Sequence, residues 1–169
     1  MKPAFDSFDV ALLNLLQLDN QATAETMSGQ IGLSPSAVTR RLRRLRATGL
    51  IATEAAQVTE RLLACHLQAT INIQLREHAE AAAVSSFRKL LIDEPAIQIC
   101  FEISGTFDLQ LVTVTRDMAA FTAFADRVLG SSPVVQRYET AFVKRIWKRK
   151  THVKVDLQDL LALDSPTGA

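Results

Sequence analysis

The chain has 169 residues, enough for one domain or two small ones, and its net charge of +1 gives no overall sign of a nucleic-acid or membrane partner. Its composition, 48% apolar and 22% charged with little Gly or Pro, excludes fibrous and low-complexity structure. No apolar run reaches the roughly 18 residues of a membrane helix, and the acidic N-terminus does not resemble an export signal, so we expect a cytoplasmic protein.

The two cysteines, Cys65 and Cys100, lack the spacing of a metal site, and each lies among apolar residues. We therefore expect both to be reduced thiols buried in the core of the protein. We expect neither a metal nor a cofactor.

The first third of the chain predicts helices. Apolar residues follow helical spacing in residues 5–18, FDSFDVALLNLLQL, so this segment has a buried face that includes Phe8. Thr23 can cap a short second helix that runs to about Gln30, and Gly32 suits the left-handed end of that helix.

A third helix is predicted over about 35–48, with Ser34 as its cap, a proline at its first position and Gly49 as its stop. At 100° per residue, a narrow aliphatic stripe would be buried. Its members are Val38, Leu42 and Leu45. The rest of the helix is polar and holds five arginines within seven residues.

This basic helix follows a short helix and a Gly-containing turn, which is the helix-turn-helix pattern, and a helix of this width fits the major groove of DNA. We predict that double-stranded DNA contacts Ser34, Ser36, Thr39, Arg40, Arg41, Arg43, Arg44 and Arg46. Helical phase puts Ser36, Thr39, Arg40 and Arg43 nearest the base edges, and it biases Arg41, Arg44 and Arg46 toward phosphates.

An arginine run is also typical of a solvated helix face. Against that interpretation, no acidic residue occurs between Glu25 and Glu54, so no partner three or four residues away neutralises these arginines.

The second half alternates between strand and helix patterns. The predicted order is strand 66–75, helix 79–95, strand 96–104, strand 109–116, helix 118–130 and strand 134–147, and the tail 156–169 has leucines at helical spacing. In the second of these helices we expect Met118 to face inward together with Phe121 and Phe124. This βαββαβ order predicts a ferredoxin-like domain with helices on one face of a four-stranded sheet.

The expected fold class is thus α+β, with an N-terminal helix-turn-helix followed by a ferredoxin-like βαββαβ domain. We place the DNA-binding domain at 1–54, a linker at 55–65, the βαββαβ domain at 66–150, and a C-terminal tail at 151–169.

Four motifs in order resemble the Lrp/AsnC family of transcriptional regulators. FDSFDVALL looks like the family's opening LDxxDxxIL, and IGLSPSAVTRRLRRLRATGLI looks like its vGLSxxxvxxRvxrLexxGvI. SGTFDLQL is similar to xGxyDxxl, and PVVQRYET is similar to PGVxxTET. The resemblance covers roughly residues 5–150. It implies a winged helix-turn-helix followed by a ferredoxin-like βαββαβ regulatory domain, with 66–150 as the effector-binding and oligomerisation domain.

The resemblance implies homodimers that assemble into an octamer, and a small effector, such as an amino acid, bound at the regulatory domains. It implies that the effector contacts Gly105, Phe107, Asp108, Tyr138 and Thr140. In this interpretation Asp108 receives an ammonium group and Gly105 lets the ligand approach closely.

The sequence departs from the family pattern in three places, of which one is Thr26, where a capping-box Glu is usual in the second helix. Thr53 and Glu54 replace a usual Gly-Tyr pair, so the wing is atypical, and Tyr138 replaces the first Thr of TET. On an extended strand Tyr138 and Thr140 share one side, so the ring competes for space beside Thr140. The effector is therefore smaller than in relatives or aromatic, or else Tyr138 fills the site and no effector binds.

Other functions compete with this one. An enzyme on the same fold, similar to tetrapyrrole decarboxylases, would need histidine- and arginine-rich motifs that the sequence lacks, so we expect no catalysis and no catalytic residues. A stand-alone effector-binding module would lose the basic helix, which is intact here. An effector-independent architectural DNA-binding protein stays open.

Overall fold

The computed structural model describes residues 5–164. The chain divides into two compact units, residues 1–56 together with 149–169, and residues 57–148. The C-terminal segment, predicted as a tail, is thus grouped with the helices at the N-terminus. The last part of that predicted tail, 165–169, lies outside the described residues.

The first unit contains α1 (Ser7–Leu18), α2 (Ala24–Ile31), α3 (Pro35–Ala47) and, from the C-terminal segment, α7 (Leu157–Asp164). The predicted caps are confirmed. The Thr23 and Ser34 hydroxyls accept hydrogen bonds from backbone N–H groups at the starts of α2 and α3, and Gly32 ends α2 with φ 71°.

The core of this unit is closed by residues from both ends of the chain. The stripe Val38, Leu42 and Leu45 is buried as predicted, and Leu160 of α7 is 2% exposed in the same cluster. Phe8 was predicted inside but is exposed, because its ring lies outside the buried cluster, with the Arg41 guanidinium 5.4 Å from its centroid. Between Leu50 and Thr59 the described chain forms no strand, so the expected wing is coil here.

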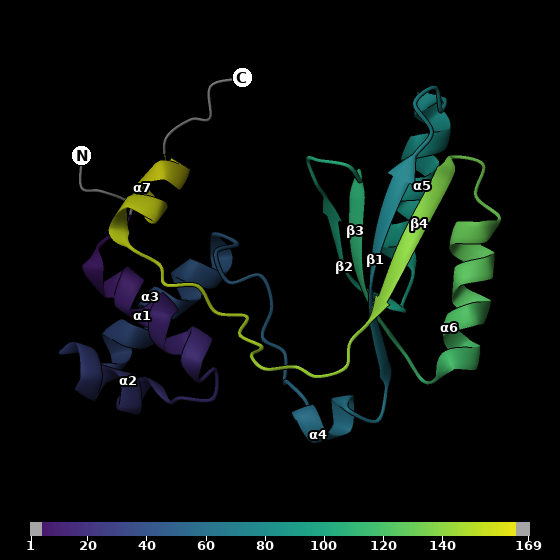
Figure 1. The fold of residues 1–169 in the computed structure, drawn as a ribbon. Coiled ribbons are helices and arrows are strands. Elements are labelled where there is room, and N and C mark those ends of the chain that lie inside the picture. Colours follow the sequence, from purple (N-terminus) through teal and green to yellow (C-terminus); the bar gives the residue numbers. More distant parts are fainter. Residues whose placement is uncertain (1–4, 165–169) are drawn as a thin grey trace. The chain divides into compact units, whose positions relative to one another are not determined.

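The second unit begins with a short helix that the sequence did not predict. Its elements are α4 (Glu60–Leu63), β1 (Leu67–Leu75), α5 (Ala81–Asp93), β2 (Ile97–Glu102), β3 (Leu109–Thr115), α6 (Met118–Ala125), which continues as a π-helix η1 (Asp126–Gly130), and β4 (Val135–Phe142). The strands are antiparallel in the order β2-β3-β1-β4, visible in Figure 1, which is the predicted ferredoxin-like sheet. β4 ends earlier than expected because its last paired residue, Phe142, lies opposite Ala69, near the start of β1.

One face of the sheet is covered by α5 and α6. Alternate residues of β1 and β3, such as Ile71, Ile73 and Leu111, are buried there against Phe87 and Phe124 of the two helices. Met118, predicted to face inward, is exposed, because it is the first residue of α6 and lies outside this cluster.

The other face of the sheet has no covering element in its own unit. Val112 of β3 pairs with Ile99 of β2, and Gln110 pairs with Phe101, so Ile99 and Phe101 lie on this face. Both are exposed, and at the centre the Gln110 amide donates a hydrogen bond to the Asn72 side chain at 3.0 Å. We call this surface the open face.

The prediction of core thiols was wrong. Cys65 and Cys100 are both exposed. Cys65 lies in the turn between α4 and β1, and Cys100 lies on the edge strand β2, where a neighbouring strand is present on one side only. Partial burial nevertheless raises the pKa of the Cys100 thiol.

Candidate DNA-binding surface and effector region

Helix α3 presents one polar face to solvent. Ser36, Thr39, Arg40 and Arg43 are exposed, while the aliphatic stripe opposite them is buried. Arg40 and Arg43 form no ion pair with any carboxylate in the part of the chain that the structure describes. Their guanidinium groups are therefore available for an external anion.

The other arginines of α3 are engaged within the unit. Arg41 lies against the first turn of α1, where its Nη1 donates to Asp6 Oδ1 at 3.0 Å and to Asp9 Oδ1 at 2.9 Å, and its Nη2 donates to Asp6 Oδ2 at 2.9 Å. Its side chain is only 20% exposed. Arg44 pairs with the other oxygen of Asp9, whose side chain is fully buried.

The same two carboxylates cap α1. Asp6 is the N-cap and accepts hydrogen bonds from the backbone amides of Phe8 and Asp9, while the Asp9 carboxylate accepts one from the Asp6 amide at 3.0 Å. One cluster of Asp6, Asp9, Arg41 and Arg44 therefore fixes the start of α1 against α3.

This cluster shifts the pKa values of Asp6 and Arg41. Burial opposes ionisation of Asp6, but hydrogen bonds from Arg41 and from the backbone amides outweigh it, so the pKa of Asp6 lies below its ordinary value of 3.8. Burial likewise opposes the charge of Arg41, yet its bonds to Asp9 and Asp6 raise the pKa of the guanidinium.

Arg46 has a separate partner. Its Nε and Nη2 donate to Glu54 Oε1 at 2.9 and 2.7 Å. The lack of acidic residues close to α3 in the sequence therefore did not show whether its arginines are neutralised. Asp6, Asp9 and Glu54 lie outside α3 in the sequence but next to it in the folded unit. The two acidic residues of FDSFD were the sequence signal for these ion pairs, but the helical pattern alone did not connect them to α3.

Three of the expected effector residues, Gly105, Phe107 and Asp108, lie in the turn between β2 and β3, at the end of the sheet where β1 stops. Gly105 has φ 149°, in the region that side chains with a Cβ rarely adopt. Asp108 is exposed and one of its carboxylate oxygens accepts a hydrogen bond from the Leu75 amide at 2.7 Å. Asp108 therefore joins the turn before β3 to the end of β1.

The structure separates these residues between the two faces of the sheet. Tyr138 pairs with Ile73, and Thr140 pairs with Ile71, so both lie on the helix-covered face, as the strand alternation predicted. Phe107 instead stacks under the guanidinium of Arg137, 5.0 Å from its ring centroid. Arg137 is adjacent to Tyr138 and so points to the open face, where it also bonds Gln74 and Glu139.

Thr140 carries a polar atom that lacks a partner. Its hydroxyl is buried, and none of the described residues forms a hydrogen bond with it. Native proteins rarely leave such a group unsatisfied, so it marks a position where a polar ligand atom or an ordered water is expected.

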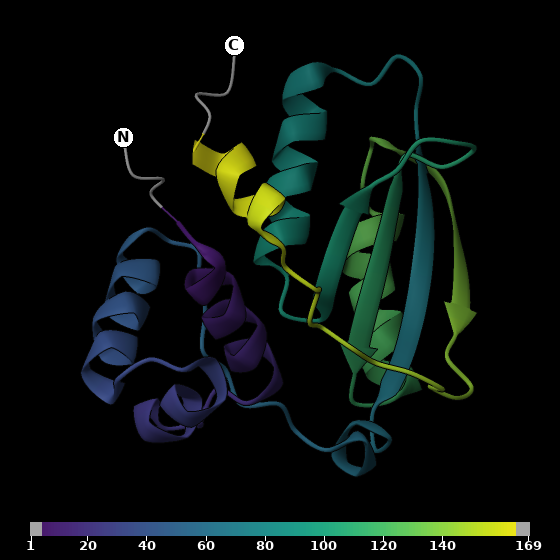
Figure 2. The same ribbon diagram turned by 90° about the vertical axis from the view of Figure 1, so that its left-hand side faces the viewer.

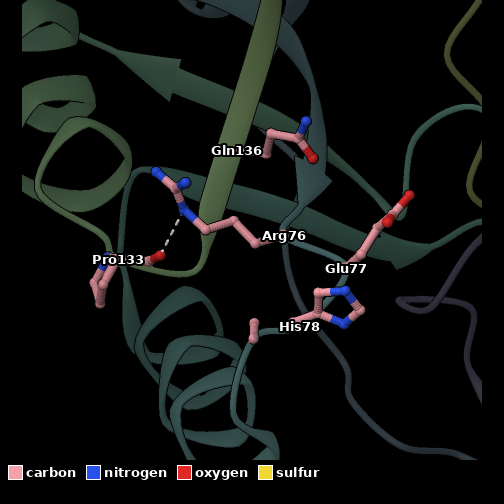
Figure 3. A pocket seen from close by; sticks show the side chains of 6 residues that line it. Arg76, Glu77, His78, Pro133 and Gln136 are labelled. Atoms are coloured by element: carbon pink, nitrogen blue, oxygen red, sulfur yellow. Dashed lines mark hydrogen bonds between the residues drawn. The ribbon is translucent and has the colours of Figure 1, made fainter.

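An open hollow of about 510 Å³ lies beside this region (Figure 3). It is lined by Arg76, Glu77, His78, Ala79, Pro133 and Gln136, and the Arg76 guanidinium donates to the Pro133 carbonyl at 2.9 Å. None of the expected effector residues lines it. Within residues 5–164, no group of three or more His, Cys, Asp or Glu side chains could hold a metal ion.

Comparison with known families identifies both units. Residues 5–46 match the AsnC-type helix-turn-helix domain, and residues 68–153 match the Lrp/AsnC ligand binding domain. The chain belongs to the Lrp/AsnC family. As a member of this family, it is a DNA-binding transcriptional regulator with a ligand-binding domain.

Similar proteins span almost the whole length of this chain. Transcriptional regulator AzlB of Bacillus subtilis is 30% identical over 151 residues, which cover 89% of this chain and 96% of that protein. The Bkd operon transcriptional regulator of Pseudomonas aeruginosa is 28% identical over 137 residues, 81% of this chain and 89% of that protein.

Solved structures agree with this Lrp/AsnC assignment. The crystal structure of a transcriptional regulator from Neisseria meningitidis in complex with L-Met has a TM-score of 0.81 and 30% identity, and the match covers 93% of this chain and 99% of that one. An AsnC family regulator from Agrobacterium tumefaciens has a TM-score of 0.79 at 22% identity, over 88% of this chain and 96% of that one. No helix among the described residues has the length and apolar character needed to cross a membrane.

Proposed function

We propose that α3 enters the major groove of an operator, with Ser36, Thr39, Arg40 and Arg43 nearest the base edges. The observation that carries this is that Arg40 and Arg43 are exposed without a carboxylate partner among the described residues, whereas Arg41 is held by Asp6 and Asp9. A guanidinium that is free to form a bidentate pair can read guanine, and each such pair discriminates by about 1–3 kcal/mol.

Arg41 then acts as a positioning residue. Its contacts fix α1 against α3, and removing it should loosen the unit without changing base preference. Ser34, at the N-terminus of α3, and the partly exposed Arg44 and Arg46 stand where phosphates flank a helix in the groove. Their carboxylate partners compete with those phosphates, so we expect them to add less affinity than a free arginine.

The test compares Arg40→Ala and Arg43→Ala with Arg41→Ala. The duplex is one selected from a random library by the wild-type protein, and a scrambled duplex of equal length is the reference. We expect the first two variants to lose about 1–3 kcal/mol on the selected duplex only. Equal losses on both duplexes would remove the assignment of base contacts.

We further propose that a small ligand of the amino-acid class binds beside β4 and modulates DNA binding. The relative crystallised with L-Met supports the ligand class, and the unsatisfied Thr140 hydroxyl supports the place. Tyr138, on the same side of the strand, limits the ligand to a small side chain or to an aromatic one that stacks on its ring. Phe107 is left out of this site because it stacks on Arg137 at the other face.

A thermal-shift screen of amino acids and aromatic acids tests this site, with Tyr138→Thr and Asp108→Asn as variants. Asp108→Asn keeps an acceptor for the Leu75 amide but removes the charge. We expect Tyr138→Thr to admit larger aliphatic amino acids. Tight binding of such ligands to the wild type, unchanged in Tyr138→Thr, would contradict the steric argument.

We also propose that the protein works as a homodimer, and as an octamer built from dimers, with regulation rather than catalysis as its activity. One α3 per chain reads only one half-site, and a two-fold dimer joins two half-sites about one DNA turn apart. The exposed Ile99 and Phe101 give the open face the apolar character of a subunit contact.

A further inference from the structure

The stretch between β4 and α7 is strongly basic. Eleven residues hold six cations, Lys144, Arg145, Lys148, Arg149, Lys150 and Lys154, and no acidic residue occurs between Glu139 and Asp156. We call residues 144–154 the basic segment. Nothing in the function proposed above uses it.

Its lysines are not neutralised by the part of the chain that the structure describes. Lys144, Lys148, Lys150 and Lys154 are all exposed, and none of them pairs with a carboxylate among residues 5–164. This contrasts with α3, where Arg41, Arg44 and Arg46 each have an acidic partner. Uncompensated cations of this density indicate an anionic partner.

An aromatic ring stands among these cations. Trp147 is 85% exposed, and the Arg145 guanidinium lies 5.1 Å from its ring centroid. A tryptophan so exposed has no packing role in its own unit. A stacked arginine and an indole beside lysines suit a nucleic acid, which offers phosphates to the cations and sugar or base surfaces to the ring.

The end of the basic segment is fixed to the DNA-binding unit. The Asn14 side-chain amide donates to the Val155 carbonyl at 2.8 Å and accepts from the Val155 amide at 2.9 Å. Gln17, one turn later on α1, makes the same pair of bonds with Val153, both at 2.9 Å. Figure 2 shows this C-terminal segment running back along α1 to α7.

The charge balance of the N-terminal helices shows why the basic segment matters for DNA binding. The described residues 5–56 contain five arginines, all in α3, and five carboxylates, Asp6, Asp9, Asp19, Glu25 and Glu54. The helices alone are therefore neutral. Non-specific affinity for DNA depends on the number of phosphates that cations neutralise, so neutral helices bind the backbone weakly.

We propose that the basic segment is a second DNA contact, which binds phosphates of the duplex outside the part of the major groove read by α3. It adds affinity on any sequence, while α3 supplies discrimination. This inference rests on the proposed DNA binding, but it concerns residues that the helix-turn-helix does not include.

Trp147 is the only tryptophan in the chain, so its fluorescence reports directly on this segment. The full-length protein is titrated with a scrambled duplex of about three helical turns, and binding is followed independently by the anisotropy of labelled DNA. We expect Trp147 emission to be quenched in step with binding, and its quenching by acrylamide to fall several-fold. DNA binding with unchanged Trp147 emission and accessibility would overturn the proposal.

A charge-matched pair of variants tests the energetics. Lys148→Gln/Lys150→Gln should weaken binding on the order of 10-fold at 0.15 M salt and flatten the salt slope by about 0.9 per lost contact, alike on selected and scrambled duplexes. Lys89→Gln/Arg116→Gln removes two exposed cations elsewhere in the second unit and should leave both quantities unchanged. Equal effects of the two double variants would mean that the segment acts only through the net charge of the protein, which would contradict a direct contact with DNA.

Two further outcomes are distinguishable. If the wild type binds no duplex, and Arg40→Ala changes nothing, the proposed function itself fails. If Trp147 emission changes with protein concentration in the absence of DNA, the segment is a contact between subunits, and the present inference is wrong while DNA binding by α3 stands.

Discussion

The two units close their cores in different ways. In the DNA-binding unit, Asp9 lies buried between two arginines, and Leu160 of α7 completes the apolar cluster that covers the inner face of α1. In the regulatory unit, α5 and α6 cover one face of the sheet, while Ile99 and Phe101 remain exposed on the other.

This difference indicates which unit depends on other molecules. The first obtains its last core residues from its own chain, and its exposed Arg40 and Arg43 are cations that DNA would bind. The second unit leaves the apolar open face uncovered. Among the partners proposed here, only another copy of the chain would cover it. Substitutions should therefore act on stability in the first unit and on association in the second.

The largest effect is expected at Asp9. Asp9→Ala removes the buried partner of Arg41 and Arg44 and half of the capping box, and it should destabilise the first unit by about 3 kcal/mol. Hydrogen exchange of the amides in α1 to α3 measures the loss, and protection in β1 and β3 should not change. The matched control is Glu54→Ala, whose exposed pair with Arg46 should be worth less than about 1 kcal/mol. Similar losses of stability in the two variants would show that the buried cluster stabilises the unit no more than an exposed ion pair does.

Leu160→Ala tests the closure of the first core by the C-terminal helix. Loss of a buried leucine costs about 2–4 kcal/mol, so α1 should exchange its amides much faster. Leu163→Ala, an exposed leucine of the same helix, should change stability by about 0.5 kcal/mol or less. If both variants behaved like the wild type, α7 would not be part of that core.

Phe101→Glu addresses the open face. A charge placed where a second sheet packs should weaken the dimer by about 2 kcal/mol, or roughly 30-fold in its dissociation constant, with little effect on the stability of the monomer. Sedimentation or light scattering at micromolar concentration measures the shift. Ile92→Glu, an exposed residue of α5, is the control and should leave association unchanged. A dimer that tolerates Phe101→Glu would have to use another surface.

The smallest effect concerns pH. Because the pKa of Asp6 is lowered in the folded state, its contribution is present above its ordinary pKa of 3.8 and is lost as the pH falls through the lowered value. Asp6→Asn should therefore be less stable than the wild type at pH 7, by under about 1 kcal/mol because the side chain is partly exposed. Urea unfolding at pH 7 and near pH 3 should show the difference shrinking with acidification. A difference that is constant with pH would mean that the charge of Asp6 is not what stabilises the unit.

The sequence predicted most of the elements because their signals are local. Caps such as Thr23 and Ser34, the stripe on α3 and the alternation in β1 depend only on residues a turn or a few positions away, and all were found where the patterns indicated. The same alternation put Tyr138 and Thr140 on one side of β4.

Contacts between distant segments were not predictable in this way. The two partners of Arg41, Asp9 and Asp6, lie 32 and 35 positions earlier in the chain, and helical phase gives no information about them. Phe107 and Tyr138 belong to motifs that the family resemblance grouped as one site, yet they face opposite sides of the sheet, because the turn before β3 carries Phe107 toward Arg137. The docking of Val153 and Val155 uses backbone groups, which every sequence has, so side-chain patterns gave no sign of it.

The return of the chain to α1 also sets an order of events during synthesis. A ribosome releases α1, α2 and α3 before the sheet, but Leu160, which lies in their core, emerges only after β1 to β4. The three helices thus wait for α7, while the sheet, which lies between them in the sequence, can already pair its strands. A chain that has not yet reached α7 would expose the apolar side of α1, so the core of the DNA-binding unit is closed only once α7 has been translated.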